Sequence, residues 1–261
     1  MLRDAWDGVQ RLFPQERILV VDRDSQCRAA RLADAIHRDA TVEVAAHGWR
    51  LARADGTAED TVADPAYREL PIQCVHSSWE PFFSAWFAAA IAAPESAGKD
   101  AVVPSPLMPH LLADWIVARI AQHRPGAIIT RVPLTGRPDT PWKRTADDHT
   151  HYASFATWMC PINCIEPERC PETRGPRNWT MPASVRLAAS HAAEHGTPYD
   201  VTAVFQTSHR AYGVGMFDVS AALDADLAIG TAAATGKPGR ALVASVSHCH
   251  GALAELVWRD P

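Results

Sequence analysis

Three cysteines stand within eleven positions of one another in a long irregular stretch of the chain, and this arrangement constrains the fold more than any other feature. The stretch covers residues 134–183, is rich in proline and shows neither helical nor strand periodicity. Its tryptophans and other aromatic residues argue against disorder. Irregular backbone of this length inside a compact protein needs something to hold it in place. We expect an inorganic centre bound by Cys160, Cys164 and Cys170 to do so.

The spacing of these residues is Cys160-x3-Cys164-x5-Cys170, and a proline follows the first and the last. Closely spaced thiolates repel one another unless a cation neutralises them, and both zinc and iron–sulfur clusters can do this. A proline after a ligand fixes its own φ angle, which stiffens a loop around a bound group. The pattern favours a 4Fe–4S cluster over zinc. A disulfide or a redox switch between two of the cysteines is the alternative to a metal.

The segment Cys160-Pro-Ile-Asn-Cys164-Ile resembles the Cys-Pro-Val-Asp-Cys-Ile segments of bacterial-type ferredoxins, and Cys170-Pro repeats their Cys-Pro ending. The similarity covers about eleven residues and does not include the Cys-x2-Cys-x2-Cys core of those proteins. It implies a style of iron–sulfur ligation. Neither the ferredoxin fold nor two-cluster electron transfer follows from it.

Three cysteines leave one position of a four-ligand site unfilled. The best remote candidate for the fourth ligand is Cys249, in a Ser-His-Cys-His-Gly run at the end of a predicted strand. Asn163, Glu166 and an external molecule are the alternatives. An open position would permit Lewis-acid chemistry on a bound substrate, whereas a closed site suits electron transfer or a structural role.

Four side chains near these cysteines are candidates for catalysis on a small anionic substrate at an open iron: Glu166, Arg174, Arg177 and His250. The two arginines would bind the anion or balance the negative charge of a cluster. His250 and His248 flank Cys249 and would share one face of an extended strand. The enzyme classes that fit such a site are a metal-dependent lyase and an oxidoreductase.

The sequence therefore leaves three functions open. In the first, three cysteines hold a cluster whose open iron acts on a small-molecule substrate. In the second, Cys249 closes the cluster, and the protein transfers electrons to a redox partner protein or senses redox state. In the third, zinc staples the loop and the remainder of the chain is an α/β binding module.

Outside this loop, strand patterns alternate with helical ones. Residues 17–22 and 41–46 predict strands, and residues 27–37 between them predict a helix, which together would form a βαβ unit. We therefore predict a Rossmann-like, mostly parallel sheet with helices on both faces. No Gly-x-Gly-x-x-Gly follows the first strand, so dinucleotide binding is not expected there.

The alternation divides the chain into three parts. Residues 1–133 form the Rossmann-like part, residues 134–183 the Pro/Cys-rich metal-binding loop, and residues 184–261 a smaller C-terminal α+β part. In this last part the patterns predict strands at 201–206, 214–218 and 240–246 and helices at 184–194 and 251–258.

Composition limits the possible partners. The chain has 261 residues, of which 47% are hydrophobic and 21% charged, and a formal net charge of −5. This balance lacks the basic surface of a nucleic-acid-binding protein. The most apolar stretch, residues 81–94, is shorter than the ~20 residues of a membrane span, and the first residues do not resemble a secretory signal. We expect a cytoplasmic protein with reduced thiols and no membrane partner.

Overall fold

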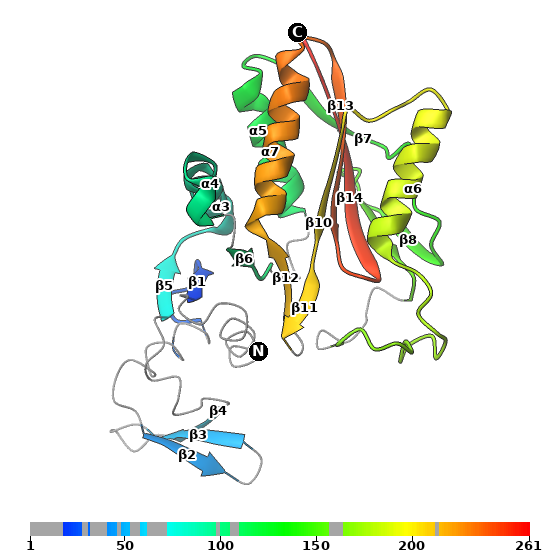
Figure 1. Cartoon of the computed structure of the whole chain (residues 1–261). Coiled ribbons are helices and arrows are strands. Elements are labelled where there is room, and N and C mark those ends of the chain that lie inside the picture. Colours follow the sequence, from blue (N-terminus) through cyan, green and yellow to red (C-terminus); the bar gives the residue numbers. More distant parts are fainter. Residues whose placement is uncertain are drawn as a thin grey trace. The chain divides into compact units, whose positions relative to one another are not determined.

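The computed structural model of the chain describes residues 18–27, 31, 41–45, 48–52, 58–61, 72–97, 100–104, 110–156, 164–211 and 214–261 (Figure 1). The chain divides into two compact units, Met1–Phe83 and Ser84–Pro261. Most of the helix predicted at 27–37, and Cys160 of the cysteine cluster, lie outside the described residues.

The N-terminal unit contains two small sheets. In one, β1 (Ile18–Asp22) pairs in parallel with β5 (Ile72–His76). The other is antiparallel, with β2 (Thr41–Ala45) next to β3 (Gly48–Ala52) and β3 next to β4 (Ala58–Thr61). The strand predicted at 41–46 is thus the first strand of an antiparallel meander and not the second strand of a βαβ unit.

The C-terminal unit is built on a six-stranded sheet with the order β10-β13-β14-β9-β8, in which β7 also pairs with β14. β10 and β13 are parallel, and the other pairs in this sheet are antiparallel. The long strand β14 pairs with β9 through its first residues and with β7 through its last. The strands are β7 (Ile128–Val132), β8 (Trp142–Thr145), β9 (His151–Ser154), β10 (Val201–Gln206), β13 (Gly239–Val246) and β14 (His250–Arg259).

A second, antiparallel sheet in this unit has the order β11-β12-β6, with β6 at Ala101–Val102, β11 at Ser208–Ala211 and β12 at Val214–Asp218. Figure 1 shows α5 and α7 on one side of the six-stranded sheet and α6 on the other. No described helix is both long and apolar enough to cross a membrane. The described helices are α3 (Trp79–Ala92), α4 (Pro94–Ala97), α5 (Leu111–His123), α6 (Met181–Glu194) and α7 (Val219–Ala234).

Apolar side chains fill both sides of the six-stranded sheet. On one side, Trp115 of α5 contacts Phe87 at a ring-centroid distance of 4.7 Å and Phe205 of β10 at 6.4 Å. Burial of each such side chain contributes roughly 1.5–3 kcal/mol. A second cluster, which includes Met181 and Val185 of α6, lies against the sheet and consists of Leu134, Ala153, Met181, Val185, Leu242, Ala244, Val246 and Leu253.

The predicted Rossmann-like, mostly parallel sheet is wrong. Parallel pairing among the described strands is confined to β1–β5 and β10–β13, and antiparallel pairing builds the rest. A sheet covered on both faces by helices has strands that are apolar throughout, so an antiparallel strand such as β14 has the same pattern as a buried parallel one.

Two further elements differ from their sequence patterns. Residues 251–258, predicted to be helical, belong to β14, where they pair with strands on both sides. The stretch predicted to be irregular contains the hairpin β8–β9, which joins the edge of the same sheet. This sheet takes strands from all three parts into which the sequence patterns divide the chain.

Candidate metal centre

The tight turn between β13 and β14 places Cys249 at one end of the six-stranded sheet. The Ser247 N–H donates to the carbonyl of His250 at 2.8 Å, and the Ser247 hydroxyl accepts from the backbone N–H groups of Cys249 (3.3 Å) and His250 (3.2 Å). The Cys249 carbonyl in turn accepts from the N–H of Phe155 at 3.0 Å. These bonds fix the backbone of a cysteine whose side chain is buried.

The start of α6 packs against the same turn. Thr180 caps the helix through a hydrogen bond from the Ala183 N–H to its hydroxyl (3.2 Å), and Pro182 occupies the first turn, where a missing N–H costs nothing. The N–H of Met181 donates to the carbonyl of His248 at 2.8 Å. The residues just before α6, including Arg177 and Trp179, are thereby anchored next to the turn.

The cysteine loop folds back on itself between residues 168 and 177. Arg169 and Pro176 form a β-bridge, the Cys170 N–H donates to the Gly175 carbonyl (3.0 Å), and the Arg174 N–H donates to the Cys170 carbonyl (2.8 Å). Glu166 and Arg174 adopt positive φ angles of 53° and 57°, which non-glycine residues rarely adopt.

The guanidinium of Arg177 brings three cysteines together. Its Nη2 donates to the sulfur of Cys164 at 3.8 Å. Burial lowers the pKa of Arg177, but its interactions with Cys164, Cys249 and Cys170 raise it above the ordinary value. Thiols from the loop and from a turn almost 80 residues further along the chain therefore lie around one positive charge.

Hydrogen-bond donors surround the sulfur of Cys170. Burial raises its pKa, but the N–H and hydroxyl of Thr173, the N–H of Glu172 and the Arg177 guanidinium lower it by more, so that the pKa of Cys170 lies below its usual range. Its side chain is only 2% exposed. Donors directed at sulfur are a common feature of cysteines that ligate metals, because the thiolate is the ligating form.

Cys249 has the opposite balance. Burial raises its pKa, and Glu166 and Cys170 add to this, while Trp179 and Arg177 only partly oppose it. The indole ring of Trp179 stacks on Phe155 with centroids 5.5 Å apart. Its N–H lies near enough to lower the pKa of Cys249, but the geometry falls short of a hydrogen bond.

Glu166 joins the loop to two other segments. One carboxylate oxygen accepts from the His248 N–H at 3.1 Å, and the other lies 3.6 Å from Nδ1 of His209 on β11. His209 was missed at the sequence level, since it is a single histidine in a short strand 43 positions from Glu166. Only the pairing of β11 with β12 brings it to the site.

Unpaired donors concentrate at this site. Among the described residues, seven buried side-chain nitrogen or oxygen atoms lack a hydrogen-bond partner, and four of these belong to Arg177, Trp179 and His209. Arg177 contributes two of them, Nε and Nη1. Guanidinium and indole N–H groups can only donate, so the missing partners are acceptors.

The two remaining predicted site residues, Arg174 and His250, are hydrogen-bonded through their backbone. Arg174 is exposed, and its contribution is a backbone one, with its carbonyl accepting from Nη2 of Arg169 at 2.6 Å. His250 is the first residue of β14 and is fixed through its backbone by Ser247. The loop and the turn thus supply Cys164, Cys170, Cys249, Arg177 and Glu166 to one place.

The described part of the chain does not contain a finished metal site. Within it, no group of three or more His, Cys, Asp or Glu side chains is arranged to hold a metal ion. Cys160, the remaining cysteine of the predicted set, lies outside that part. For Cys164, Cys170 and Cys249 to bind a metal, their sulfur atoms must move closer together than they are around the Arg177 guanidinium.

Residues 112–259, more than half of the chain, match the model of a family described as AF_1314_C, uncharacterized protein, C-terminal domain. The chain belongs to this family. The matched residues include every member of the cysteine site and almost all of the six-stranded sheet. No curated protein and no solved structure matches the chain.

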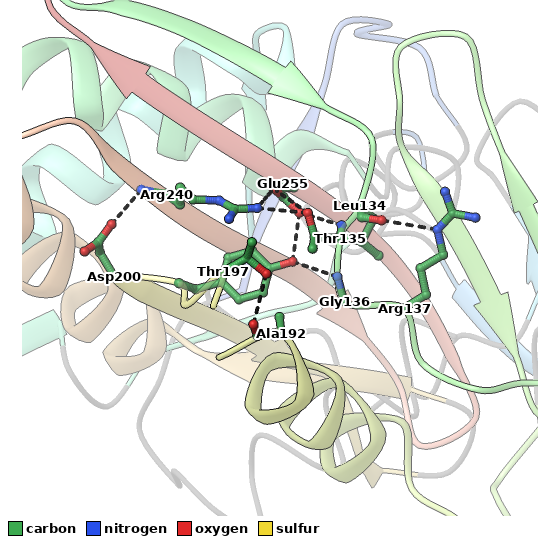
Figure 2. A network of polar contacts seen from close by, with 10 residues as sticks. Leu134, Thr135, Gly136, Arg137, Ala192, Thr197, Asp200, Arg240 and Glu255 are labelled. Carbon is green, nitrogen blue, oxygen red and sulfur yellow. Dashed lines mark hydrogen bonds and ion pairs between the residues drawn. The ribbon is translucent and has the colours of Figure 1, made fainter. Parts of the chain in front are cut away.

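A second buried polar network, centred on Glu255 of β14, differs from the cysteine site (Figure 2). The Glu255 side chain is 1% exposed and accepts from the Thr135 N–H (2.7 Å), the Tyr199 hydroxyl (2.8 Å) and Arg240. Tyr199 in turn accepts from the Gly136 N–H at 3.1 Å. Burial raises the pKa of Glu255, but these donors lower it by more, so the group is a carboxylate held by the fold.

Proposed function

We propose that this protein binds a 4Fe–4S cluster through Cys160, Cys164, Cys170 and Cys249, and that the closed cluster transfers electrons to a partner protein or senses redox state. The observation that carries this proposal is the position of Cys249. The turn that holds Cys249 is hydrogen-bonded through His248 to Glu166 and to Met181, on either side of Cys170 and Arg177, although nearly 80 residues separate Cys249 from Cys170 in the chain.

The charges around the sulfur atoms support an anionic centre. A cluster with four thiolate ligands is negatively charged, and Arg177 supplies a positive charge next to three of the proposed ligands. The lowered pKa of Cys170 favours the thiolate that binding requires. The reduced thiols that such a centre needs fit a cytoplasmic location, which we also propose.

The same geometry argues against the open iron that the spacing of three cysteines alone suggests. The Glu166 carboxylate accepts from the His248 N–H, and the Arg177 guanidinium donates to the sulfur of Cys164. Arg174 is exposed. A cluster with four cysteine ligands therefore fits better than an enzyme acting on a small anion.

The first experiment is metal analysis of protein prepared without oxygen. We expect about four iron and four acid-labile sulfide ions per chain and the visible absorption of an iron–sulfur cluster. Zinc without sulfide would contradict the proposal and favour a structural zinc site. A protein with neither metal would leave a thiol-based switch between the cysteines.

The second experiment tests Cys249 as the fourth ligand. Cys249→Ser should lose the cluster or change the electron paramagnetic resonance spectrum of its reduced form, as should Cys164→Ser and Cys170→Ser. Cys27→Ser is the matched control, because Cys27 belongs to the N-terminal unit. An unchanged spectrum in Cys249→Ser would exclude this thiol as a ligand and restore the open-iron hypothesis.

A further inference from the structure

His151 of β9 is a buried histidine in the edge hairpin of the six-stranded sheet. It is 2% exposed, and its Nδ1 lies 3.0 Å from the hydroxyl of Thr145 on β8. In the register of the sheet, His151 is opposite Thr145 on one side and Leu253 of β14 on the other. Leu253 belongs to the apolar cluster that lies against the sheet, to which α6 contributes Met181 and Val185. The imidazole therefore lies in largely apolar surroundings.

These surroundings suit a neutral imidazole and not a charged one. A neutral imidazole has one N–H donor and one acceptor nitrogen, whereas an imidazolium has two N–H donors and a positive charge. Among the described residues, Nδ1 of His151 has Thr145 as its hydrogen-bond partner and Nε2 has none. Protonation adds a charge that apolar neighbours cannot solvate, which is unfavourable in a side chain so fully buried.

Two positive charges near His151 make its protonation still less favourable. Lys143 of β8 pairs with Ala153, which lies two positions from His151 on the same face of the sheet. Arg137, in the segment that leads from β7 to β8, adds a second positive charge. Burial lowers the pKa of His151 below its ordinary value, and the charges of Arg137 and Lys143 lower it further.

Two acidic side chains of the adjoining segments are paired with other groups. Glu255, two positions after Leu253 on β14, accepts from Arg240. Asp148, in the turn between β8 and β9, accepts from Arg131 at 2.6 Å. Each carboxylate therefore already has a cationic partner of its own, so neither is free to balance a charge on His151.

The hairpin that contains His151 occupies the edge of the sheet. β8 is the last strand in the described order of the sheet, and β9 pairs with β14 through four residues, His250–Leu253. Short edge elements open locally at a lower free-energy cost than the central strands of a sheet. β9 leads directly to Phe155, whose N–H donates to the Cys249 carbonyl. Opening of the hairpin would thus also loosen the turn that holds Cys249.

We propose that the β8–β9 hairpin is an acid-sensitive element, in which protonation of His151 releases the hairpin from β14 while β13 and β10 stay paired. A proton from solvent binds the ring nitrogen that carries none in the neutral form, and opening of the hairpin hydrates the resulting charge. The stability that the neutral ring provides is complete above about pH 6.5, the pKa of an unfolded histidine, and is lost as the pH falls below that value. This inference does not depend on what the cysteines bind.

The test is hydrogen–deuterium exchange of the full-length protein, followed by mass spectrometry at about pH 7.5 and about pH 5 and corrected for the intrinsic pH dependence of exchange. At the lower pH we expect the protection of β9 amides to fall several-fold and that of β13 amides to stay unchanged. His151→Gln cannot become charged, so its β9 amides should stay protected at both pH values. His149→Asn is the matched control, because it replaces a less buried histidine of the same hairpin at a positive φ angle that asparagine tolerates. This variant should keep the pH dependence.

A second pair of variants tests the positive charges and does not alter His151. Lys143→Gln removes a charge from the face that His151 shares, so the loss of protection at about pH 5 should be smaller. Arg144→Gln removes the neighbouring charge, which is paired with Tyr152 on the opposite face, and should leave the loss unchanged. Both positions are exposed, so neither substitution disturbs the core.

Every result of this experiment decides the inference. Unchanged protection of β9 at about pH 5, or an equal loss in β9 and β13, would overturn it. The same loss in His151→Gln as in the unmodified protein would overturn it as well. If His151→Gln does not fold, the charge variants decide. A smaller loss in Lys143→Gln than in Arg144→Gln supports the inference, and equal losses in the two contradict it.

Discussion

Two polar clusters in the C-terminal unit each contain a charged side chain, and they differ in how completely that side chain is hydrogen-bonded. Around Glu255, a buried carboxylate is surrounded by donors from Thr135, Tyr199 and Arg240, and both of its oxygens accept hydrogen bonds (Figure 2). Around Arg177, a half-buried guanidinium donates to the sulfur of Cys164, and among the described residues its Nε and Nη1 have no hydrogen-bond partner. The Glu255 carboxylate takes its partners from the protein, although among the described residues Nε of Arg240 is also buried without a hydrogen-bond partner.

The carboxylate at the centre of the Glu255 cluster has a structural role. A buried charge whose partners all come from the protein stabilises one arrangement of strands, and here it ties the segment before β8 and the segment after α6 to β14. Unpaired buried donors are unfavourable for the fold, and among the described residues four of the seven unpaired atoms belong to Arg177, Trp179 and His209 near the cysteines.

The largest effect should come from removing the carboxylate of the Glu255 cluster. In Glu255→Ala, Arg240 loses its buried counter-ion and the Thr135 N–H loses its acceptor, so we expect the free energy of unfolding to fall by about 3–5 kcal/mol. Urea denaturation followed by circular dichroism measures this. Glu194→Ala, at an exposed position, is the control and should change stability by less than about 0.5 kcal/mol. A similar small change in Glu255→Ala would contradict a structural role for this cluster.

The next effect is steric and compares one glycine from each region. A Cβ atom on Gly136 would lie 2.5 Å from the carbonyl oxygen of Ala188, so Gly136→Ala must displace α6 and should cost about 1–3 kcal/mol. On Gly175, in the cysteine loop, the nearest atom would be 3.7 Å away. Gly175→Ala should therefore be within about 0.5 kcal/mol of the unmodified protein in the same denaturation experiment. Equal costs at the two positions would show that the loop is packed as tightly as the Glu255 cluster.

A smaller, pH-dependent effect should come from Tyr199. Burial, with Glu255 adding to it, raises the pKa of Tyr199 to about 12, against about 10 for an unfolded tyrosine. The folded state thus holds the phenolic proton more tightly, and this contribution is complete below pH 10 and is lost as the pH rises through 12. Tyr199→Phe should be about 1 kcal/mol less stable at pH 8. The difference from the unmodified protein should shrink above pH 10, and a constant difference up to pH 12 would contradict the raised pKa.

The smallest effect is expected at Arg177 in the metal-free protein. Because two of its nitrogens have no partner, Arg177→Gln removes little favourable interaction and should change the free energy of unfolding by at most about 1 kcal/mol. In protein reconstituted with the proposed cluster the change should be larger, because the guanidinium then faces the negative charge of the cluster. Denaturation of both forms measures the two values. A large loss of stability in the metal-free protein would place Arg177 with Glu255 as a structural residue.

Sequence patterns predicted single elements better than their pairing. The strands expected at 201–206 and 214–218 are confirmed as β10 and β12, and the helix expected at 184–194 is confirmed within α6. The helix expected at 251–258 is wrong because the apolar residues of β14 have helical spacing as well as strand propensity. Pairing of residues 251–258 with β13 stabilises the strand instead of the helix. The local spacing of apolar residues in the sequence carries no information about this pairing.

The candidate site shows the same division. The sequence by itself determined which residues are candidates, since three cysteines within eleven positions, with two arginines and a glutamate next to them, are visible in the order of the chain. Only the tertiary structure decided that Cys249 and His209 lie with them and that Arg177, not Arg174, is turned toward the sulfur atoms. The physical reason is that the chemistry of a thiol or an imidazole follows from the residue type alone. Proximity, burial and unpaired donors arise from how the β13–β14 turn, β11 and the loop pack together.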